Sequence, residues 1–561
     1  MKGASLSNPQ RCGWVVALLL GLVYLGSIGP HWKIQCDSAM FIGLGESLVE
    51  GRGYSFGGLF CAGTPFGWPL LMAGLYRLFG RNFLVMNTVL VLMSLATLWL
   101  VYRSIKEMAG AWWGLIVVTL TGLLHVMVEY SVYLMTDMPG MFGFWLGFYF
   151  LQRLVLQPAF AWTDVLGASC GLMLACAFRY TSAFAVPLFA LAPWLRRWEQ
   201  PRKFHKNLLL AAVLVLPAVL LLAWWIDFST KQAVVCYQRA VAIGGSSPVA
   251  ALPAYITWGD LIGLALRPLA GLWLTAPALM NAALKGLTTF GLEAIRLEDP
   301  NYLNPLRIAA YGAAFLILGI LVGLGGWRVS KTDRGLSLIA VLIYCASMLV
   351  AQRAAVQRYL LPLFPFLLWF IAEGLNLAWE RWRPHRGKPE APATPTGFPL
   401  RWPTTVCLIG LLLPNLVNIA REIRQVHRAD YYATLEKGAW KDLWAVSEWI
   451  RQHAPPEARL FTREFAVMHF WTKRPCVWRF KDTRPGDLLV LEHIPDLRRR
   501  FNQWQVEPLK WEQDEARRAR ALVERGAARE VFRSGAISVY LRGPKGAAQT
   551  QSPPRDQGGR S

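Results

Sequence analysis

The strongest constraint on this chain is a series of apolar runs, each long enough to cross a lipid bilayer. The runs are about 15–20 residues long, and a helix of that length spans the hydrocarbon core. They recur through most of the 561 residues, of which 54% are hydrophobic and 17% charged. A soluble protein of this size could not bury so much apolar surface. We therefore predict an all-α polytopic membrane bundle.

These runs predict about eleven transmembrane helices. Their approximate ranges are 13–29, 82–101, 111–129, 138–152, 165–179, 182–195, 208–226, 306–326, 335–351, 359–378 and 403–420. Residues 1–420 would form the transmembrane domain, with outer loops over 30–81 and 227–305. Arg179 to Ser182 leave little room for a turn between two of the ranges. One long helix there, which would reverse the orientation of all that follows, stays an alternative.

The basic residues predict the orientation of the bundle. Lys and Arg gather in the connections after every second predicted span, on the side of the N-terminus. Because positive loops face the cytoplasm, we predict that this side is cytoplasmic and the opposite loops are outside. The net charge of +23 then serves orientation and contact with anionic lipid. We find no nucleic-acid-binding motif, so no nucleic-acid partner is predicted.

From about residue 421 the composition becomes that of a water-soluble unit. A helix predicted over 440–453 has one apolar face that can pack. Three short strands and a charged helix are predicted at 459–462, 487–491, 536–541 and 512–525. We expect a small α/β C-terminal domain over 421–543 on the outer side, followed by a disordered tail over 544–561.

The nine cysteines include no CxxC pair and no Cys/His cluster with zinc spacing. They therefore predict no metal site. Cys36 and Cys61 bracket the first outer loop, where a disulfide can form in an oxidising compartment. The sequence leaves their pairing open.

Several charged residues fall at the outer ends of predicted spans, far apart in the sequence but near one membrane boundary. A charge in such a position is costly unless it has a partner or a function. The candidates are Asp37, Asp137, Arg179, Arg353, Arg358 and the adjacent Tyr359.

Each candidate also has a purely structural explanation. Asp37 or Asp137 could cap the helix that follows it, and the arginines could extend to lipid headgroups. Glu46 and Glu50 are spaced as one solvated face of a helix. His125 and Glu129 are predicted to pair or pack locally.

Carboxylates and guanidinium groups at a membrane surface suit glycosyl transfer from a polyprenyl-phosphate donor. The leaving phosphate is stable as an anion, so the reaction needs no general acid. It needs a base for the acceptor hydroxyl and cations for the phosphate. A glycosidase would need two acids with matched roles. A single exposed aspartate, Asp37, therefore fits a transferase better than a hydrolase.

A set of motifs follows in order along most of the chain. They are the stretches 37–54 and 65–73, Thr136-Asp137-Met138-Pro139, 171–179, Arg358-Tyr359-Leu360-Leu361-Pro362, 448–456 and 472–474. The ordered set resembles the GT-C-type integral-membrane glycosyltransferases. The likeness is nearest to the bacterial protein O-mannosyltransferase and aminoarabinose (lipid A) transferase families.

The resemblance implies a helical bundle with interfacial helices in the first outer loop and a polyprenyl-phosphate sugar as donor. It implies that Asp37 is the catalytic base and that Asp137 is an active-site acid that helps to bind the donor or a metal. A divalent cation thus stays open as a cofactor. The candidate ligands of the donor phosphate are Arg179, Arg358, Tyr359 and Arg353.

Two positions depart from the family patterns. Ser38 follows Asp37 where protein O-mannosyltransferases usually have glutamate, and Gly63-Thr64 stand where the aminoarabinose enzymes commonly have a basic residue. The sequence therefore leaves open the sugar and the acceptor, which could be a lipid, a glycan or a protein.

From these observations we predict an inverting glycosyltransferase of the bacterial inner membrane, with its active site facing the periplasm. The main alternative is a transporter or flippase of lipid-linked sugars. A transporter should carry charges in mid-span and paired inverted repeats, which we do not find in the sequence. A binding protein whose C-terminal domain recruits cell-wall partners is a second alternative.

Overall fold

The fold is described from a computed structural model of the chain. The described residues are 9–56, 59–60, 64–196, 204–242, 305–333, 335–351, 357–382, 400, 402–434, 440–455, 457–462, 465–477, 483–492, 510–535 and 537–543. Arg353, Cys61, most of the expected loop 227–305 and the expected tail 544–561 lie outside them, and so does the side chain of Cys36. The pairing of Cys36 and Cys61 therefore stays open, and the disordered tail and the role of Arg353 stay predictions.

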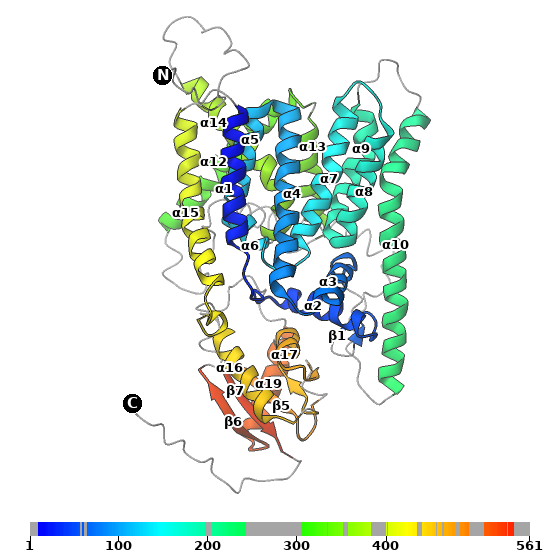
Figure 1. The fold of residues 1–561 in the computed structure, drawn as a ribbon, viewed down its shortest axis with the longest axis vertical. Coiled ribbons are helices and arrows are strands. Elements are labelled where there is room, and N and C mark those ends of the chain that lie inside the picture. Colours follow the sequence, from blue (N-terminus) through cyan, green and yellow to red (C-terminus); the bar gives the residue numbers. More distant parts are fainter. Residues whose placement is uncertain are drawn as a thin grey trace, which may run out of the picture.

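Long helices packed side by side form the larger part of the molecule (Figure 1). They are α1 (Pro9–Gly26), α4 (Phe83–Ala109), α5 (Ala111–Gly122), α7 (Asp137–Leu156), α8 (Trp162–Phe178), α9 (Val186–Leu195), α10 (Phe204–Ala242), α12 (Pro305–Ser330), α13 (Leu336–Ala351), α14 (Phe364–Trp382) and α15 (Trp402–Val426). Every predicted span overlaps one of these helices. Among the described residues, five helices are long and apolar enough to cross a membrane. The number of crossings stays a prediction.

The helix packing separates an apolar interior from an apolar outer surface. Helix α14 buries Phe364, Phe366, Trp369 and Phe370 almost completely. By contrast α1, α10 and α15 expose large apolar side chains, which include Trp14, Leu18, Leu209, Trp224, Ile409 and Leu413. A helix that is apolar on its outward face is solvated by lipid rather than water. This distribution fits a multi-pass membrane protein.

Three predicted boundaries differ from those in the structure. The predicted span 111–129 is divided into α5 and the short helix α6 (His125–Tyr130), because the His125 N–H donates to Asn415 Oδ1 at 2.8 Å instead of continuing α5. Helix α8 ends before Arg179, which is extended and leads into the 3-10 turn η1 (Tyr180–Ala185). The chain therefore turns here, and the single long helix is ruled out. Helix α10 continues through Ala242, so the start of the expected outer loop is helical.

The first outer loop folds into two helices and a hairpin below the bundle (Figure 1). Helix α2 (Cys36–Val49) packs against α3 (Gly67–Phe79), and strands β1 (Ser55–Phe56) and β2 (Leu59–Phe60) pair antiparallel between them. Gly45 makes the close contact of α2 with α3 possible, since a side-chain carbon there would lie 2.9 Å from Met72 Cβ. This loop separates the bundle from the C-terminal elements.

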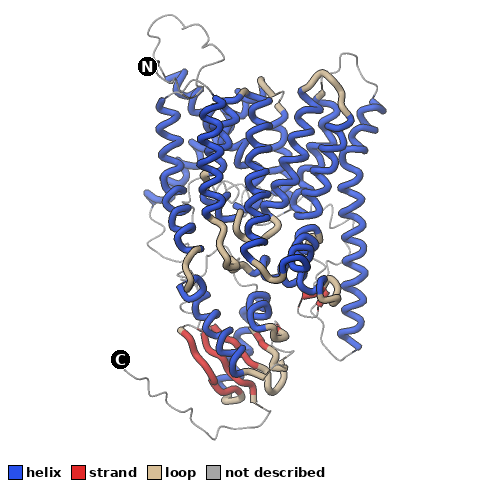
Figure 2. Tube along the Cα trace, in the orientation of Figure 1, coloured by secondary structure: helices blue, strands red, loops and turns tan. Residues whose placement is uncertain are grey.

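The C-terminal elements form a small α/β unit at the far end of the molecule (Figure 2). Its sheet has the order β4-β3-β5-β7-β6. The elements are α16 (Trp440–His453), β3 (Leu460–Phe461), α17 (Phe465–Thr472), β4 (Cys476–Val477), β5 (Leu488–Glu492), α19 (Lys510–Glu524), β6 (Ala528–Ser534) and β7 (Ile537–Arg542). Strand β3 is parallel to β4 and β5, whereas β7 is antiparallel to β5 and β6. The predicted helices and strands overlap α16, α19, β3, β5 and β7, and sequence reasoning missed α17, β4 and β6.

Glycines let α7 and α8 approach closely. A side-chain carbon at Gly171 would overlap the backbone of Gly147, and one at Gly143 would overlap the backbone of Ala175. Small residues at such a contact are typical of helix pairs in membranes, where close backbone packing replaces the hydrophobic effect. The contact fixes α7 and α8 against each other, and with them the residues at their ends.

We predict that Gly171→Ala destabilises the protein by about 2 kcal/mol or more, because the added methyl group overpacks the α7–α8 contact. Thermal unfolding of the detergent-solubilised protein measures the effect. Gly21→Ala on α1 is the matched control, since a methyl group there meets nothing within 4 Å. Equal stability of the two variants would show that the close contact is not needed.

Candidate functional site

Asp37 lies in the first turn of α2 and pairs with an arginine from the other end of the sequence. Arg358 Nη1 donates to Asp37 Oδ2 at 2.7 Å. Arg358 belongs to the 3-10 turn η5 (Gln357–Leu363), which leads into α14. The N-cap of α2 is Gln35, so Asp37 does not cap this helix. Its carboxylate instead faces a cation.

Asp137 is the first residue of α7 and forms a buried ion pair with Arg179. Arg179 follows the last residue of α8, and its Nε donates to Thr181 Oγ1 at 2.8 Å. Gly140 leaves room for the arginine stem, because a side-chain carbon there would lie 2.9 Å from Arg179 Cβ. The side chain of Asp137 is 0% exposed and that of Arg179 10%. Neither residue therefore extends to lipid headgroups.

The ring of Tyr359 lies beside the arginines of both ion pairs. The guanidinium carbon of Arg179 lies 5.0 Å from the centre of the Tyr359 ring, and that of Arg358 lies 5.3 Å from it. Arg358 also interacts electrostatically with both Asp137 and Asp37. Five of the six candidate residues are thus gathered in one place, although they come from α2, α7, the end of α8 and η5. The sixth, Arg353, lies outside the described residues.

Exposure and hydrogen bonding distinguish the members of this cluster. The side chain of Asp37 is 40% exposed, whereas that of Asp137 is fully buried. The Nε of Arg358 is buried and has no hydrogen-bond partner in the part of the chain that the structure describes. A guanidinium group presents five N–H donors. Asp37 is therefore the carboxylate that a substrate can reach, and Arg358 has donors left for an anion.

The described residues of this cluster do not form a metal site. Asp37 and Asp137 each pair with an arginine. Across the described residues, no group of three or more His, Cys, Asp or Glu side chains is placed to hold a metal ion. No step proposed below uses a metal.

Sequence reasoning missed two tyrosines of the site. Tyr130, on α6, is buried and interacts electrostatically with Asp137, Arg179 and Arg358. Tyr344, on α13, is buried and contacts the same cluster through Thr181 and Arg179. Both positions look like ordinary apolar core in the sequence, so no motif could have identified them.

A second charged network lies next to this cluster. Lys33 pairs with Glu422 of α15 and lies 3.8 Å from Glu129, and His125 Nε2 lies 2.9 Å from Glu422 Oε2. His125 and Glu129 therefore do not both pair locally as expected: the partner of His125 is the distant Glu422, whereas Glu129 accepts from the nearby Tyr133 hydroxyl at 3.2 Å. The network ties the segment before Asp37 to α6 and α15.

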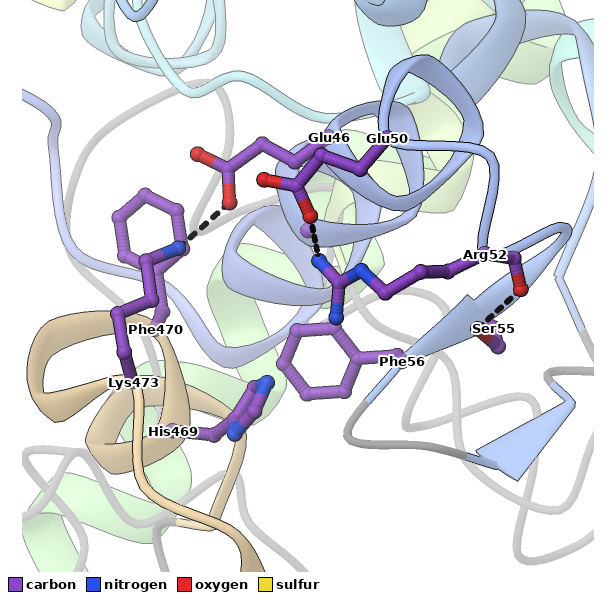
Figure 3. Close-up of a pocket in the computed structure, with 9 residues that line it drawn as sticks. Glu46, Glu50, Arg52, Ser55, Phe56, His469, Phe470 and Lys473 are labelled. Carbon is purple, nitrogen blue, oxygen red and sulfur yellow. Dashed lines mark hydrogen bonds and ion pairs between the residues drawn. The ribbon is translucent and has the colours of Figure 1, made fainter. Parts of the chain in front are cut away.

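The prediction that Glu46 lies on a solvated helix face is also wrong. Glu46 is 2% exposed and pairs with Arg81 and Lys473, whereas the side chain of Glu50 is 46% exposed. Both glutamates line a cavity of about 270 Å³ between α2, β1 and α17 (Figure 3). The C-terminal unit covers this face of α2, and the sequence periodicity of α2 could not reveal that cover.

The histidine that lines this cavity has a lowered pKa because it is buried. His469 lies on α17 with its ring edge-on to Phe56, at 4.9 Å between centroids, and its Nδ1 donates to the Arg474 carbonyl at 2.7 Å. Burial lowers the pKa of His469 below the ordinary 6.5. Nearby Lys473 and Arg52 also lower it, while the Arg474 carbonyl and Glu46 raise it.

We predict that acid weakens the docking of α17 on the first outer loop. Because the folded state lowers the pKa of His469, its contribution to stability is present above about pH 6.5 and is lost as the pH falls through the folded-state pKa. Thermal unfolding between pH 7.5 and 5 should show this loss, and His469→Gln should reduce it. His453→Gln, at an exposed histidine of α16, is the control. An identical loss in wild type and His469→Gln would contradict the prediction.

Known proteins resemble this chain in part of its sequence and in its fold. A family model described as dolichyl-phosphate-mannose-protein mannosyltransferase matches residues 64–224. That range includes Asp137 and Arg179. Asp37 and Arg358 lie outside it. A comparison with curated protein sequences gives no match.

Solved structures match over nearly the whole chain. ArnT from Cupriavidus metallidurans bound to undecaprenyl phosphate has 13% identity and a TM-score of 0.53, over 96% of this chain and 99% of that one. ArnT of the same organism in the apo state has 12% identity and a TM-score of 0.51, over 96% and 100%. At these identities the likeness concerns the fold. Together with the family model, it shows that this chain has the fold of the GT-C-type membrane glycosyltransferases.

Proposed function

We propose that the protein transfers a sugar from a polyprenyl-phosphate donor to a hydroxyl of a lipid, glycan or protein acceptor. The observation that carries this proposal is the gathering of Asp37, Arg358, Asp137, Arg179 and Tyr359 at one end of a GT-C bundle. A half-exposed carboxylate beside paired guanidinium groups supplies the base and the phosphate ligands that this reaction needs. The likeness to ArnT bound to undecaprenyl phosphate supports the donor class.

In this proposal Asp37 is the general base. Its exposure allows an acceptor hydroxyl to approach, and the ion pair with Arg358 directs its carboxylate into the site. Asp137 has a different role, because it is fully buried and its partner is Arg179. It holds Arg179 in position beside the Tyr359 ring.

Arg358 is the preferred ligand of the donor phosphate. Its Nε has no hydrogen-bond partner within the described residues, whereas the Nε of Arg179 already donates to Thr181. A phosphate oxygen could accept from that free donor while Asp37 keeps Nη1. Tyr359 lies against both guanidinium groups and restricts their movement.

The reaction then proceeds by a single displacement. Asp37 takes the proton of the acceptor hydroxyl, the hydroxyl oxygen bonds to the anomeric carbon, and the bond from that carbon to the phosphate oxygen breaks. The electron pair of the broken bond leaves with the polyprenyl phosphate, whose charge Arg358 and Arg179 stabilise. Attack opposite the leaving group inverts the anomeric configuration. If the acceptor is itself a phosphate, it needs no deprotonation and Asp37 orients it.

The site is proposed to face the periplasm of a bacterial inner membrane. The basic connections lie at the end of the bundle opposite the first outer loop, as the contacts of Arg103 with Tyr149 and of Arg153 with Asp164 indicate for α4, α7 and α8. The C-terminal unit lies on the side of the first outer loop (Figure 1). Positive connections face the cytoplasm, so the site and this unit would be outside.

We predict that Asp37→Asn lowers sugar transfer by about 100- to 10,000-fold, the usual effect of removing a general base. Membranes that contain equal amounts of each variant would be given radiolabelled polyprenyl-phosphate sugars. Asp227→Asn, at an exposed carboxylate of α10, is the matched control. Unchanged transfer by Asp37→Asn would falsify the base assignment. Movement of labelled lipid across the bilayer without transfer by wild type would favour the transporter.

We predict that Arg358→Lys raises the donor KM about tenfold or more, because an ammonium group cannot pair with Asp37 and a phosphate in the forked geometry of a guanidinium group. Initial rates over a range of donor concentrations measure this. Arg328→Lys, at an arginine paired with Glu373 and Glu380 on α14, is the control. If both variants keep the wild-type donor KM, Arg358 does not bind the donor.

A further inference from the structure

The C-terminal unit contacts α2 near the end that carries Asp37. Trp32 lies shortly before α2, is 0% exposed, and packs edge-on against Phe470 and Trp471 of α17 at 4.7 and 6.0 Å between ring centroids. Its Nε1 donates to the hydroxyl of Ser38, at 2.8 Å, and its backbone N–H donates to Tyr432 Oη, at 3.0 Å. Ser38 is the neighbour of Asp37. This contact therefore fixes the start of α2.

The same unit contacts the other end of α2 through an ion pair. Lys473 Nζ lies 2.6 Å from Glu46 Oε2, and Arg81 binds the other carboxylate oxygen. Figure 3 shows Lys473 reaching from the end of α17 toward Glu46 across the cavity. The Glu46 carboxylate is buried, whereas the Lys473 side chain is half exposed. Because Arg81 also pairs with Glu46, the carboxylate links the C-terminal unit to both α2 and the start of α4.

The backbone at Lys473 supports a specific role for this contact. Its φ is +57°, and it is the sole residue other than glycine with a positive φ in the part of the chain that the structure describes. Its N–H donates the last helical hydrogen bond of α17, to the His469 carbonyl at 2.8 Å, and its left-handed φ ends the helix. A left-handed conformation is costly for lysine and persists where surrounding contacts require it. Here it directs the ammonium group toward Glu46.

We propose that Glu46 and Lys473 are positioning residues. Through their ion pair the C-terminal unit holds α2 so that Asp37, beside Arg358, faces the acceptor. The proposal rests on the proposed function. A helix rises about 1.5 Å per residue, so the part of α2 from Asp37 to Glu46, nine positions further on, forms a rigid arm of roughly 14 Å. A small tilt of this arm displaces Asp37, and a displacement of about 1 Å can cost about 100-fold in rate.

The test compares wild type with Lys473→Met, which keeps most of the length of the side chain and removes its charge. Hydrogen exchange of the full-length protein should become about tenfold faster over 37–49, with exchange at the start of α7 unchanged. The kcat for sugar transfer should fall about tenfold or more. The donor KM should stay within about twofold of wild type, because the phosphate ligands are on other elements.

Two further variants separate positioning from a general loss of stability. Lys473→Arg, which keeps the charge, should keep wild-type exchange and kcat. Glu46→Gln should lower kcat at least as much as Lys473→Met, because it removes the partner of Arg81 as well as that of Lys473. Arg451→Met removes an exposed ion pair with Glu448 on α16 and should change neither readout. If hydrogen exchange over 37–49 is the same in Lys473→Met as in wild type, the ion pair does not hold α2, whatever the activity. Faster exchange with unchanged kcat would overturn the positioning role. Absence of transfer by wild type would instead overturn the proposed function.

Discussion

The structure depends on pairing charges at the boundary between the helix bundle and the outer loops. A charge there is costly without a partner, and breaking a buried pair costs about 3–5 kcal/mol. Asp137 with Arg179 and Asp37 with Arg358 meet this requirement between elements that are distant in the sequence. The same pairs bring a base and phosphate ligands together, so the requirement for stability also builds the candidate site.

The geometry of these pairs depends on helix packing further inside the bundle. Gly143, Gly147 and Gly171 let α7 and α8 touch along their backbones. Asp137 begins α7 and Arg179 follows α8, so the contact determines how far apart the two charges are. Asp37 is placed differently, since it belongs to a short helix outside the bundle. Its position relies on contacts with α3, with Arg358 and with the C-terminal unit.

Pattern recognition in the sequence succeeded where local rules decide the structure. The apolar runs predicted the long helices, because a helix exposed to lipid must be apolar over its whole length. The helical spacing of apolar residues over 440–453 predicted α16, which packs one apolar face. The motifs that contain Asp37, Asp137, Arg179 and Arg358 identified residues that the structure gathers. Their pairing was not predictable, since residues 37 and 358 belong to segments with no local relation.

Errors arose where a tertiary contact overrides a local pattern. Glu46 has the spacing of a solvated residue, yet Lys473 and Arg81 bury it. The His125 N–H donates to Asn415, and this contact ends what the sequence suggested was one helix.

The amino-acid sequence by itself determined that the chain forms a lipid-facing helical bundle with acids and arginines at one boundary, because hydrophobic length acts locally. Only the tertiary structure decided which acid meets which arginine and which carboxylate stays exposed, because those outcomes depend on packing between distant segments.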